Sequence, residues 1–182
     1  REKIIPFEKD PRWGHHGIPE DLRRDLNAAA KAAGLLGINS PEEFGGQGLG
    51  FAEMAVVVEE LAKTLSPEPV VASSVLSASL LIASDNEPLK KTLLTKIASG
   101  ESIVGAALGG RFSAEVGVTE KNGVLNGVAH HVYPALSASD FIVAAKGADG
   151  VALFHVPANV AGLSIKDELR ADGTFAGTLT LK

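Results

Sequence analysis

Residues 33–49 read AGLLGINSPEEFGGQGL, and this stretch joins two segments that both have the residue spacing of helices. The first segment follows Pro19 and ends near Gly34, because a glycine in the left-handed region typically stops a helix. The glycines of residues 45–50 invite a phosphate-loop interpretation. However, no strand precedes them and no Gly-Lys-Ser/Thr follows, which excludes both a P-loop and a dinucleotide-binding fingerprint. We therefore interpret the stretch as a tight loop between helices, in which glycine permits close backbone approach.

The chain has helical periodicity on both sides of this loop, as far as about Gly100. A third helix is expected over residues 70–84 and a fourth from about residue 89. The expected inward faces are Leu22, Leu26, Ala29, Ala30 and Ala33 on the first helix, Phe51, Met54, Ala55, Val58, Leu61, Ala62 and Leu65 on the second, and Leu89, Leu93, Leu94 and Ile97 on the fourth. Four helices with short connections predict an antiparallel bundle.

After Gly100 the hydrophobic period drops toward two, which is typical of strands. Asn122-Gly123 lies between two short apolar segments and predicts a hairpin. Further strands are expected over residues 141–145, 151–156 and 174–181. The predicted fold class is α+β multidomain: an all-α helical bundle over residues 1–100, then a small antiparallel β-barrel or sandwich over residues 101–182.

Composition excludes several classes of protein. The chain has 182 residues, no cysteine, and 17 basic against 22 acidic side chains, for a net charge of −5. Disulfide scaffolds, thiolate metal sites and cysteine nucleophiles are therefore excluded, and nucleic acid is not an expected partner. The uncharged run at residues 69–84 is shorter than the roughly 20 residues of a membrane-spanning helix, so we expect a cytoplasmic protein. Arg1 is not a start methionine, and we expect the chain to be part of a longer protein.

Spacing alone identifies no catalytic chemistry. His130 and His131 are adjacent on a predicted strand, so we expect them to face opposite ways and not to share a metal. The alternative that one of these two histidines faces a ligand pocket remains open. Tyr133 precedes Pro134 and is either a core residue with a hydrogen-bonded tip or a hydroxyl aimed into a cleft. No metal site and no catalytic triad are predicted.

Several segments together resemble the acyl-CoA dehydrogenase superfamily. Residues 33–49 are similar to its "GLLG" and "PEE(F/Y)GGxGL" motifs, and residues 58–62 to its "VxEEL". Residues 94–101, 123–127 and 154–157 resemble "LPxLASGE", "GYxLNG" and "LFLVP" in the same order. The resemblance covers nearly the whole chain. It implies an N-terminal helical domain, a middle β domain and a second helical bundle beyond Lys182.

The resemblance also implies FAD-dependent oxidation of acyl-CoA thioesters to 2,3-enoyl forms, with hydride passing to FAD. The family's catalytic glutamate lies in the C-terminal bundle, so no catalytic residue is expected in this chain. The implied cofactor-binding residues are Leu108, Gly109, His131, Val132 and Tyr133. Residues 107–113 replace the family's "TEPxxGSD" without its threonine or acid. His131 stands at a tryptophan position and Tyr133 at that of a small hydroxyl residue.

These departures leave three hypotheses. The chain is an active flavoenzyme with an unusual pocket, a flavin-free subunit of a heteromeric dehydrogenase, or an acyl-CoA-binding scaffold. Residues 169–174 resemble a "xxDGT" variant from a branch that handles bulky, sterol-like acyl-CoA. The expected partners are acyl-CoA and further acyl-CoA dehydrogenase-type subunits, in a homo- or hetero-oligomer. The 182 residues alone are predicted to be inactive.

Overall fold

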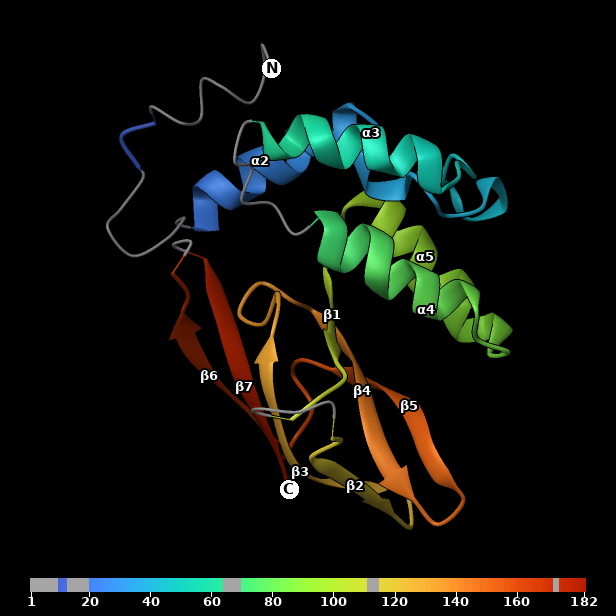
Figure 1. The fold of residues 1–182 in the computed structure, drawn as a ribbon, viewed down its shortest axis with the longest axis vertical. Helices are drawn as coiled ribbons and strands as arrows, with labels where there is room; N and C mark the ends of the chain where they lie inside the picture. Colours follow the sequence, from blue (N-terminus) through green and yellow to red (C-terminus); the bar gives the residue numbers. More distant parts are fainter. Residues whose placement is uncertain (1–9, 13–19, 64–69, 111–114, 172–173) are drawn as a thin grey trace. The chain divides into compact units, whose positions relative to one another are not determined.

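The computed structural model describes residues 10–12, 20–63, 70–110, 115–171 and 174–182 (Figure 1). These residues fall into two compact units, Arg1–Ser102 and Ile103–Lys182, and each is described by itself. Several sequence features lie outside the described residues: the helix start at Pro19, the predicted inward residue Leu65, residues 111–113 and the Asp172-Gly173 pair.

The first unit is helical, as predicted. Its elements are α2 (Glu20–Ala32), the short 3-10 turns η1 (Leu35–Gly37) and η2 (Glu42–Phe44), α3 (Phe51–Ala62), the π-helix η3 (Val70–Ser77), α4 (Ala78–Ile82) and α5 (Glu87–Ser99). The third predicted helix therefore begins as a π-helix and continues as α4. Gly100 ends α5 with φ 72°, which confirms it as the stop. Leu22, Leu26, Leu93, Leu94 and Ile97 are buried as expected.

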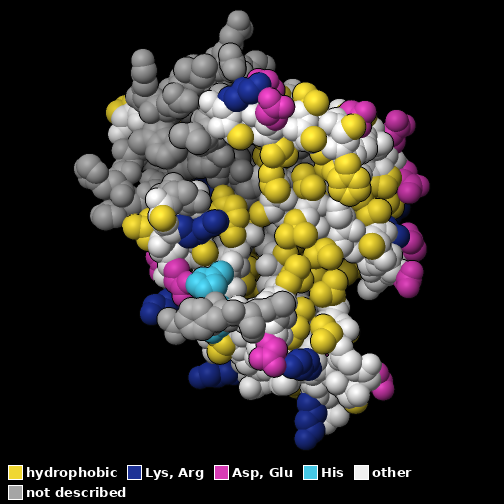
Figure 2. Space-filling model, viewed as in Figure 1, with side chains coloured by type: hydrophobic (Ala, Val, Ile, Leu, Met, Phe, Trp, Pro, Cys, Tyr) yellow, Lys and Arg dark blue, Asp and Glu magenta, His cyan; other side chains and the backbone are white. Residues whose placement is uncertain are grey.

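The predicted inward face of α3 is correct only in part. Met54 is buried, and Val58 and Leu61 are half-buried, whereas Phe51 is 79% exposed. The physical reason is that apolar residues occupy a wide arc of α3 opposite its three glutamates, so helical spacing alone does not determine which part of that arc is buried. Figure 2 shows many hydrophobic side chains on the visible surface of the helical unit.

The glycine-rich loop folds back on the segment that precedes it. The backbone nitrogens of Gln47, Gly48 and Leu49 donate to the carbonyls of Gly37, Ser40 and Ile38 at 2.8–2.9 Å. A Cβ on Gly46 would lie 2.0 Å from the Ser40 carbonyl oxygen. Gly46 is thus required for close packing, and the loop is structural, as the sequence indicates.

We expect Gly46→Ala to lower the free energy of unfolding by more than about 2 kcal/mol, because the new methyl group meets backbone atoms that have no room to move. Gly45→Ala is the matched control. Gly45 has φ 81°, and no atom lies within 4 Å of the position that a Cβ would take, so only the left-handed conformation is penalised, by about 1 kcal/mol. Denaturant unfolding of the two variants measures the difference, and equal losses would contradict the close-approach argument.

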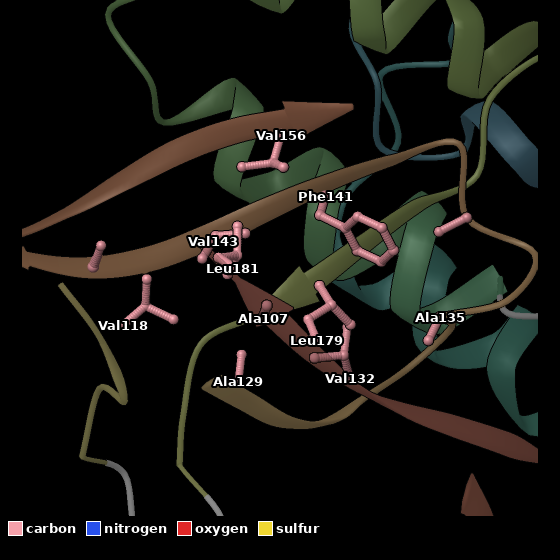
Figure 3. Packing of buried hydrophobic residues seen from close by; sticks show 12 residues of the cluster. Ala107, Val118, Ala129, Val132, Ala135, Phe141, Val143, Val156, Leu179 and Leu181 are labelled. Carbon is pink, nitrogen blue, oxygen red and sulfur yellow. The ribbon is translucent and has the colours of Figure 1, made fainter. Parts of the chain in front are cut away.

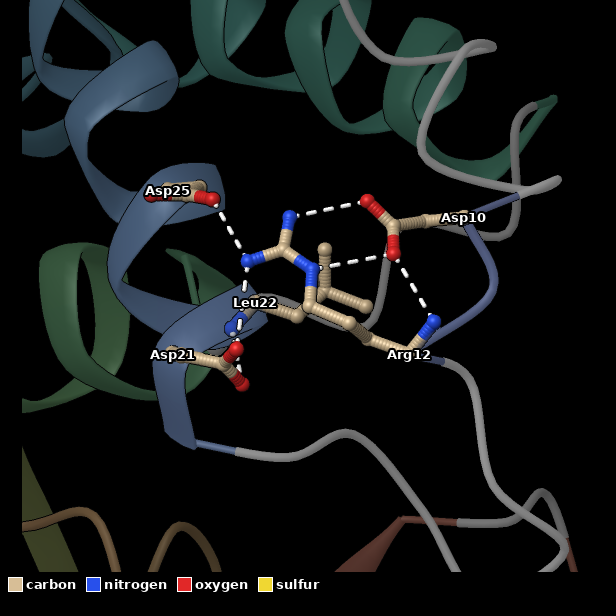
Figure 4. A network of polar contacts seen from close by, with 5 residues as sticks. All are labelled: Asp10, Arg12, Asp21, Leu22 and Asp25. Atoms are coloured by element: carbon tan, nitrogen blue, oxygen red, sulfur yellow. Dashed lines mark hydrogen bonds and ion pairs between the residues drawn. The ribbon is translucent and has the colours of Figure 1, made fainter.

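Arg12 connects the segment before α2 to that helix (Figure 4). Its Nε and Nη2 donate to the two oxygens of Asp10 at 2.9 and 2.8 Å, and its Nη1 lies 2.8 Å from Asp25 and 3.3 Å from Asp21. The hydrogen bonds from Arg12 lower the pKa of Asp10 to about 2. Asp21 also has a lowered pKa, mainly because its carboxylate accepts the Leu22 backbone N–H.

The contribution of Asp10 to stability is expected to depend on pH. Its folded-state pKa lies below the ordinary 3.8, so its contribution is present above pH 3.8 and is lost as the pH falls toward 2. Arg12→Gln should return the pKa of Asp10 to its ordinary range, whereas Arg24→Gln on the exposed side of α2 should leave it low. An NMR titration of the carboxyl carbon reads this directly. An unchanged titration in Arg12→Gln would refute the assignment.

The second unit is a seven-stranded sheet. Its strands are β1 (Val104–Ala107), β2 (Val118–Lys121), β3 (Val124–Val132), β4 (Asp140–Gly147), β5 (Gly150–Pro157), β6 (Leu163–Leu169) and β7 (Phe175–Leu181). Their order is β1-β4-β2-β3-β7-β6, with β5 on β4. Most pairs are antiparallel, as expected, but β1 and β2 each pair with β4 in parallel. The predicted Asn-Gly hairpin joins β2 to β3. Strand β6 was not predicted.

The core of this unit lies between the inward faces of the strands (Figure 3). It contains Phe141 and Val143 of β4, Val132 of β3 and Leu179 of β7, all essentially inaccessible to solvent. These side chains come from strands that are far apart in sequence. Their packing in one core places the end of β3 next to β1, β6 and β7. That junction contains every residue that the sequence suggests for a cofactor site.

Candidate functional site

Two separate segments bring the suggested cofactor-binding residues together. Leu108 and Gly109 follow β1 directly, and Tyr133 follows the end of β3. Ala106 and Tyr133 form an antiparallel bridge, so the exit of β1 lies beside the exit of β3. Leu108 is 36% exposed and Gly109 is half-buried. The structure therefore brings these two segments together, although their binding of a cofactor stays a prediction.

A β-bulge shapes the end of β3. The register with β7 shifts between Ala129 and Val132, and His131 adopts a positive φ of 55°. Ala129 and Val132 are both buried, although strict alternation would place them on opposite faces. The side chain of Val132 thus belongs to the core, and only its backbone can face a ligand.

The bulge overturns the expectation that His130 and His131 face opposite ways. Their ring centroids are 6.2 Å apart, and both side chains contact residues of the β6–β7 pair. The Nδ1 atom of His131 lies 3.4 Å from Glu168 Oε2, and that of His130 lies 3.1 Å from Thr178 Oγ1. The alternation rule fails here because one extra residue has been inserted into the strand.

Thr178 links His130 to Glu168. Its hydroxyl donates to Glu168 Oε1 at 2.6 Å. A threonine hydroxyl has one proton, so Thr178 Oγ1 accepts from His130, and His130 carries a proton on Nδ1. One carboxylate from β6 therefore organises both histidines of β3. Neither residue has a local sequence signal. Glu168 lies in the charged run 166–168 of β6, and Thr178 lies in the expected strand β7 but meets β3 only through the register of the sheet.

Tyr133 is also engaged by the end of β6. The guanidinium carbon of Arg170 lies 5.1 Å from the centroid of the Tyr133 ring, within cation–π range. The Arg170 backbone nitrogen donates to the Thr174 carbonyl at 2.8 Å. Glu168 and Arg170 thus contact His131 and Tyr133, two of the residues that the sequence suggests for a cofactor site.

A second polar group lies on β4 and β5. His155 Nε2 is 2.8 Å from Asp140 Oδ1, and the Ser139 hydroxyl donates to Asp140 Oδ2 at 2.9 Å. In a nucleophilic triad the hydroxyl donates to the imidazole, whereas here it donates to the carboxylate, so this arrangement is not that of a triad. In the part of the chain that the structure describes, no three His, Cys, Asp or Glu residues could hold a metal ion.

Glu168→Ala is expected to lower the free energy of unfolding by roughly 1–2 kcal/mol, because it removes the charged acceptor of Thr178 and the partner of His131. Asp167→Ala is the matched control. It changes the neighbouring exposed residue, which pairs with Gly177, and should cost less than about 0.5 kcal/mol. Chemical denaturation gives both values. If the two substitutions cost the same, the shared-carboxylate arrangement does not contribute to stability.

Comparison with known proteins gives consistent matches. Residues 1–101 match the family model of the acyl-CoA dehydrogenase N-terminal domain. A curated relative, acyl-CoA dehydrogenase FadE34 of Mycobacterium tuberculosis, is 28% identical over 120 residues, which are 66% of this chain and 16% of that protein. No helix among the described residues has the length and apolar character needed to cross a bilayer.

Three solved structures show the same fold. The ChsE4–ChsE5 complex from Mycobacterium tuberculosis has a TM-score of 0.80 and 28% identity, covering 87% of this chain and 44% of that chain. A variant of the Tcur3481–Tcur3483 steroid ACAD has a TM-score of 0.78 and 29% identity, covering 100% and 49%. An acyl-CoA dehydrogenase of Bacillus anthracis complexed with FAD has a TM-score of 0.77 and 28% identity, covering 100% and 33%.

The chain therefore spans less than half of each of these solved chains and about a sixth of FadE34. The family model nevertheless matches more than half of this chain, and the described fold agrees with helical and β domains in that order. The chain belongs to the acyl-CoA dehydrogenase family.

Proposed function

We propose that this chain is the flavin-free subunit of a heteromeric acyl-CoA dehydrogenase. The assembled enzyme would oxidise bulky, sterol-like acyl-CoA thioesters to their 2,3-enoyl forms. FAD, held by a partner subunit of the same family, would supply the redox chemistry. One observation carries the proposal. Glu168 of β6 contacts His131, and Arg170, which directly follows β6, lies over the ring of Tyr133.

The residues at this site do not fit the edge of a flavin. An isoalloxazine ring needs a flat partner and hydrogen-bond donors that are held ready for its polar edge. Arg170 already covers the ring of Tyr133, and Glu168 already engages the imidazole of His131. A flavin at these positions would have to displace two charged side chains from existing partners.

The segment after β1 adds no side-chain donor among its described residues. Leu108, Gly109 and Gly110 carry neither a hydroxyl nor an acid, where the family has a threonine-bearing turn. Each buried polar group left without a partner costs roughly 1–3 kcal/mol. Two such losses would weaken flavin binding by roughly a hundredfold or more, since 1.4 kcal/mol is a factor of ten.

The partner and substrate classes are supported by the relatives. The ChsE4–ChsE5 structure is a complex of two named chains, and the Tcur3481–Tcur3483 structure is described as a steroid ACAD. Residues 169–174 of this chain, LRADGT, resemble the variant that goes with bulky acyl groups. Together these likenesses favour a two-component enzyme with a sterol-like substrate over a homomeric enzyme with a short acyl chain.

The experiment is to purify the protein alone and together with a flavin-competent dehydrogenase subunit, and to record the visible spectrum of each preparation. The protein alone should be colourless, and a sterol-like acyl-CoA should bleach flavin absorbance only in the mixed assembly. The double variant His131→Trp/Tyr133→Thr, which restores the family's residue types, is the matched comparison for cofactor retention.

A yellow preparation of the protein alone, with one FAD per chain, would overturn the proposal and return the chain to the ordinary flavin-bearing dehydrogenases. Acyl-CoA-dependent bleaching by residues 1–182 without a partner would likewise contradict it. A colourless protein that forms no complex with any family subunit would favour the scaffold hypothesis instead.

A further inference from the structure

The β2–β3 hairpin contains the dipeptide Asn-Gly twice. Asn122-Gly123 forms the turn, and Asn126-Gly127 lies four residues further along β3. The side chains of both asparagines are exposed, so access of water does not distinguish the two positions. What distinguishes them is the backbone. The same chemical unit therefore occurs in one hairpin in two different conformational settings.

At the turn the backbone is open. Asn122 and Gly123 have φ values of 54° and 79°, as expected for a two-residue turn with both central residues in the left-handed region. No atom lies within 4 Å of the position that a Cβ on Gly123 would take. Neighbouring residues therefore leave room around Gly123 for the backbone to rearrange.

We propose that Asn122 is a site of spontaneous deamidation and that Glu120 slows the reaction. The backbone nitrogen of Gly123 attacks the side-chain carbonyl carbon of Asn122. The bond from that carbon to Nδ2 breaks, and Nδ2 leaves as ammonia with the proton that Gly123 has lost. Water then opens the cyclic imide at either carbonyl, which gives aspartate or isoaspartate. The step needs no oxidant, metal or enzyme.

At Asn126 the ladder holds the backbone. Asn126 pairs with Thr119, whose hydroxyl donates to the Asn126 carbonyl at 3.1 Å. Gly127 pairs with Val118 on one side and with Leu181 on the other. A Cβ on Gly127 would lie 2.3 Å from the Gly117 carbonyl oxygen, so the backbone is closely packed there. Ring closure at Asn126 therefore requires strands to separate first, and such local opening costs free energy.

Glu120 acts on the nucleophile of the turn. The Gly123 backbone N–H donates to Glu120 Oε1 at 2.7 Å. Gly123 must lose this proton before its nitrogen can attack, and a nearby negative charge opposes the formation of a second one. The Glu120 carboxylate therefore slows deamidation at a turn whose backbone otherwise has room to rearrange, and we call this its role as a brake.

Deamidation would change the hairpin in two ways. Either product adds a negative charge close to Glu120. Isoaspartate also adds a carbon to the main chain of a two-residue turn, whose length sets the pairing of Lys121 with Val124. Either the strands must then shift or the turn must open. We therefore expect strand pairing in this hairpin to weaken as the protein ages.

The test is to incubate the wild-type protein and Glu120→Gln at mildly alkaline pH and to quantify aspartate and isoaspartate at both sites by peptide mass spectrometry. We expect conversion at Asn122 to be more than about tenfold faster than at Asn126 in the folded protein. In Glu120→Gln the rate at Asn122 should rise several-fold, while that at Asn126 stays unchanged. In urea the difference between the two sites should disappear.

Asn126 is also the control for folding of the variant. If the rates at both sites rise together in Glu120→Gln, the carboxylate only holds the hairpin closed, and its role as a brake is overturned. An unchanged rate at Asn122 overturns that role too. Equal conversion at the two sites in the folded wild-type protein overturns the proposal as a whole. None of these outcomes depends on whether the chain binds flavin.

Discussion

The bulge at the end of β3 is the constraint on which the candidate site depends. Ala129 and Val132 must both be buried, yet they are an odd number of residues apart, so a regular strand would expose one of them. One extra residue resolves the conflict and forces His131 into a positive φ. The same extra residue turns His130 and His131 toward β6 and β7, where His130 contacts Thr178 and His131 contacts Glu168.

Much of the fold follows from local sequence, for identifiable reasons. Asn122-Gly123 supplies the two left-handed residues of a hairpin turn, and Gly100 supplies the stop of α5. The helical stripe of α5 is narrow enough to identify its buried face. The apolar arc of α3 is too wide for that, and only part of its predicted face is buried. Strand β6 is not revealed in the same way, because three consecutive charged residues, 166–168, interrupt its alternation.

Only some residues of the candidate site could be predicted from the sequence. The motif places His131 and Tyr133, because both lie in a segment that aligns with a family pattern. Glu168, Arg170 and Thr178 come from β6, its exit and β7, and only the register of the sheet brings them to β3. The bulge itself has no local signature, since neither histidine is a glycine or another residue that favours a positive φ as strongly. Long-range pairing, rather than residue type, determines which side chains meet.

The location of the His131–Glu168 network explains how its residues could change without a change of fold. Val132, Phe141 and Leu179 form a core that is closed within the β unit and involves no residue of the His131–Glu168 network. The substituted side chains lie at its edge, where His131 has a side-chain exposure of 57% and Glu168 one of 36%. Replacing a side chain there changes no core volume, so it leaves the free energy of core packing intact. What it changes is the set of polar partners, and in this chain Glu168 and Arg170 supply those partners from within the domain.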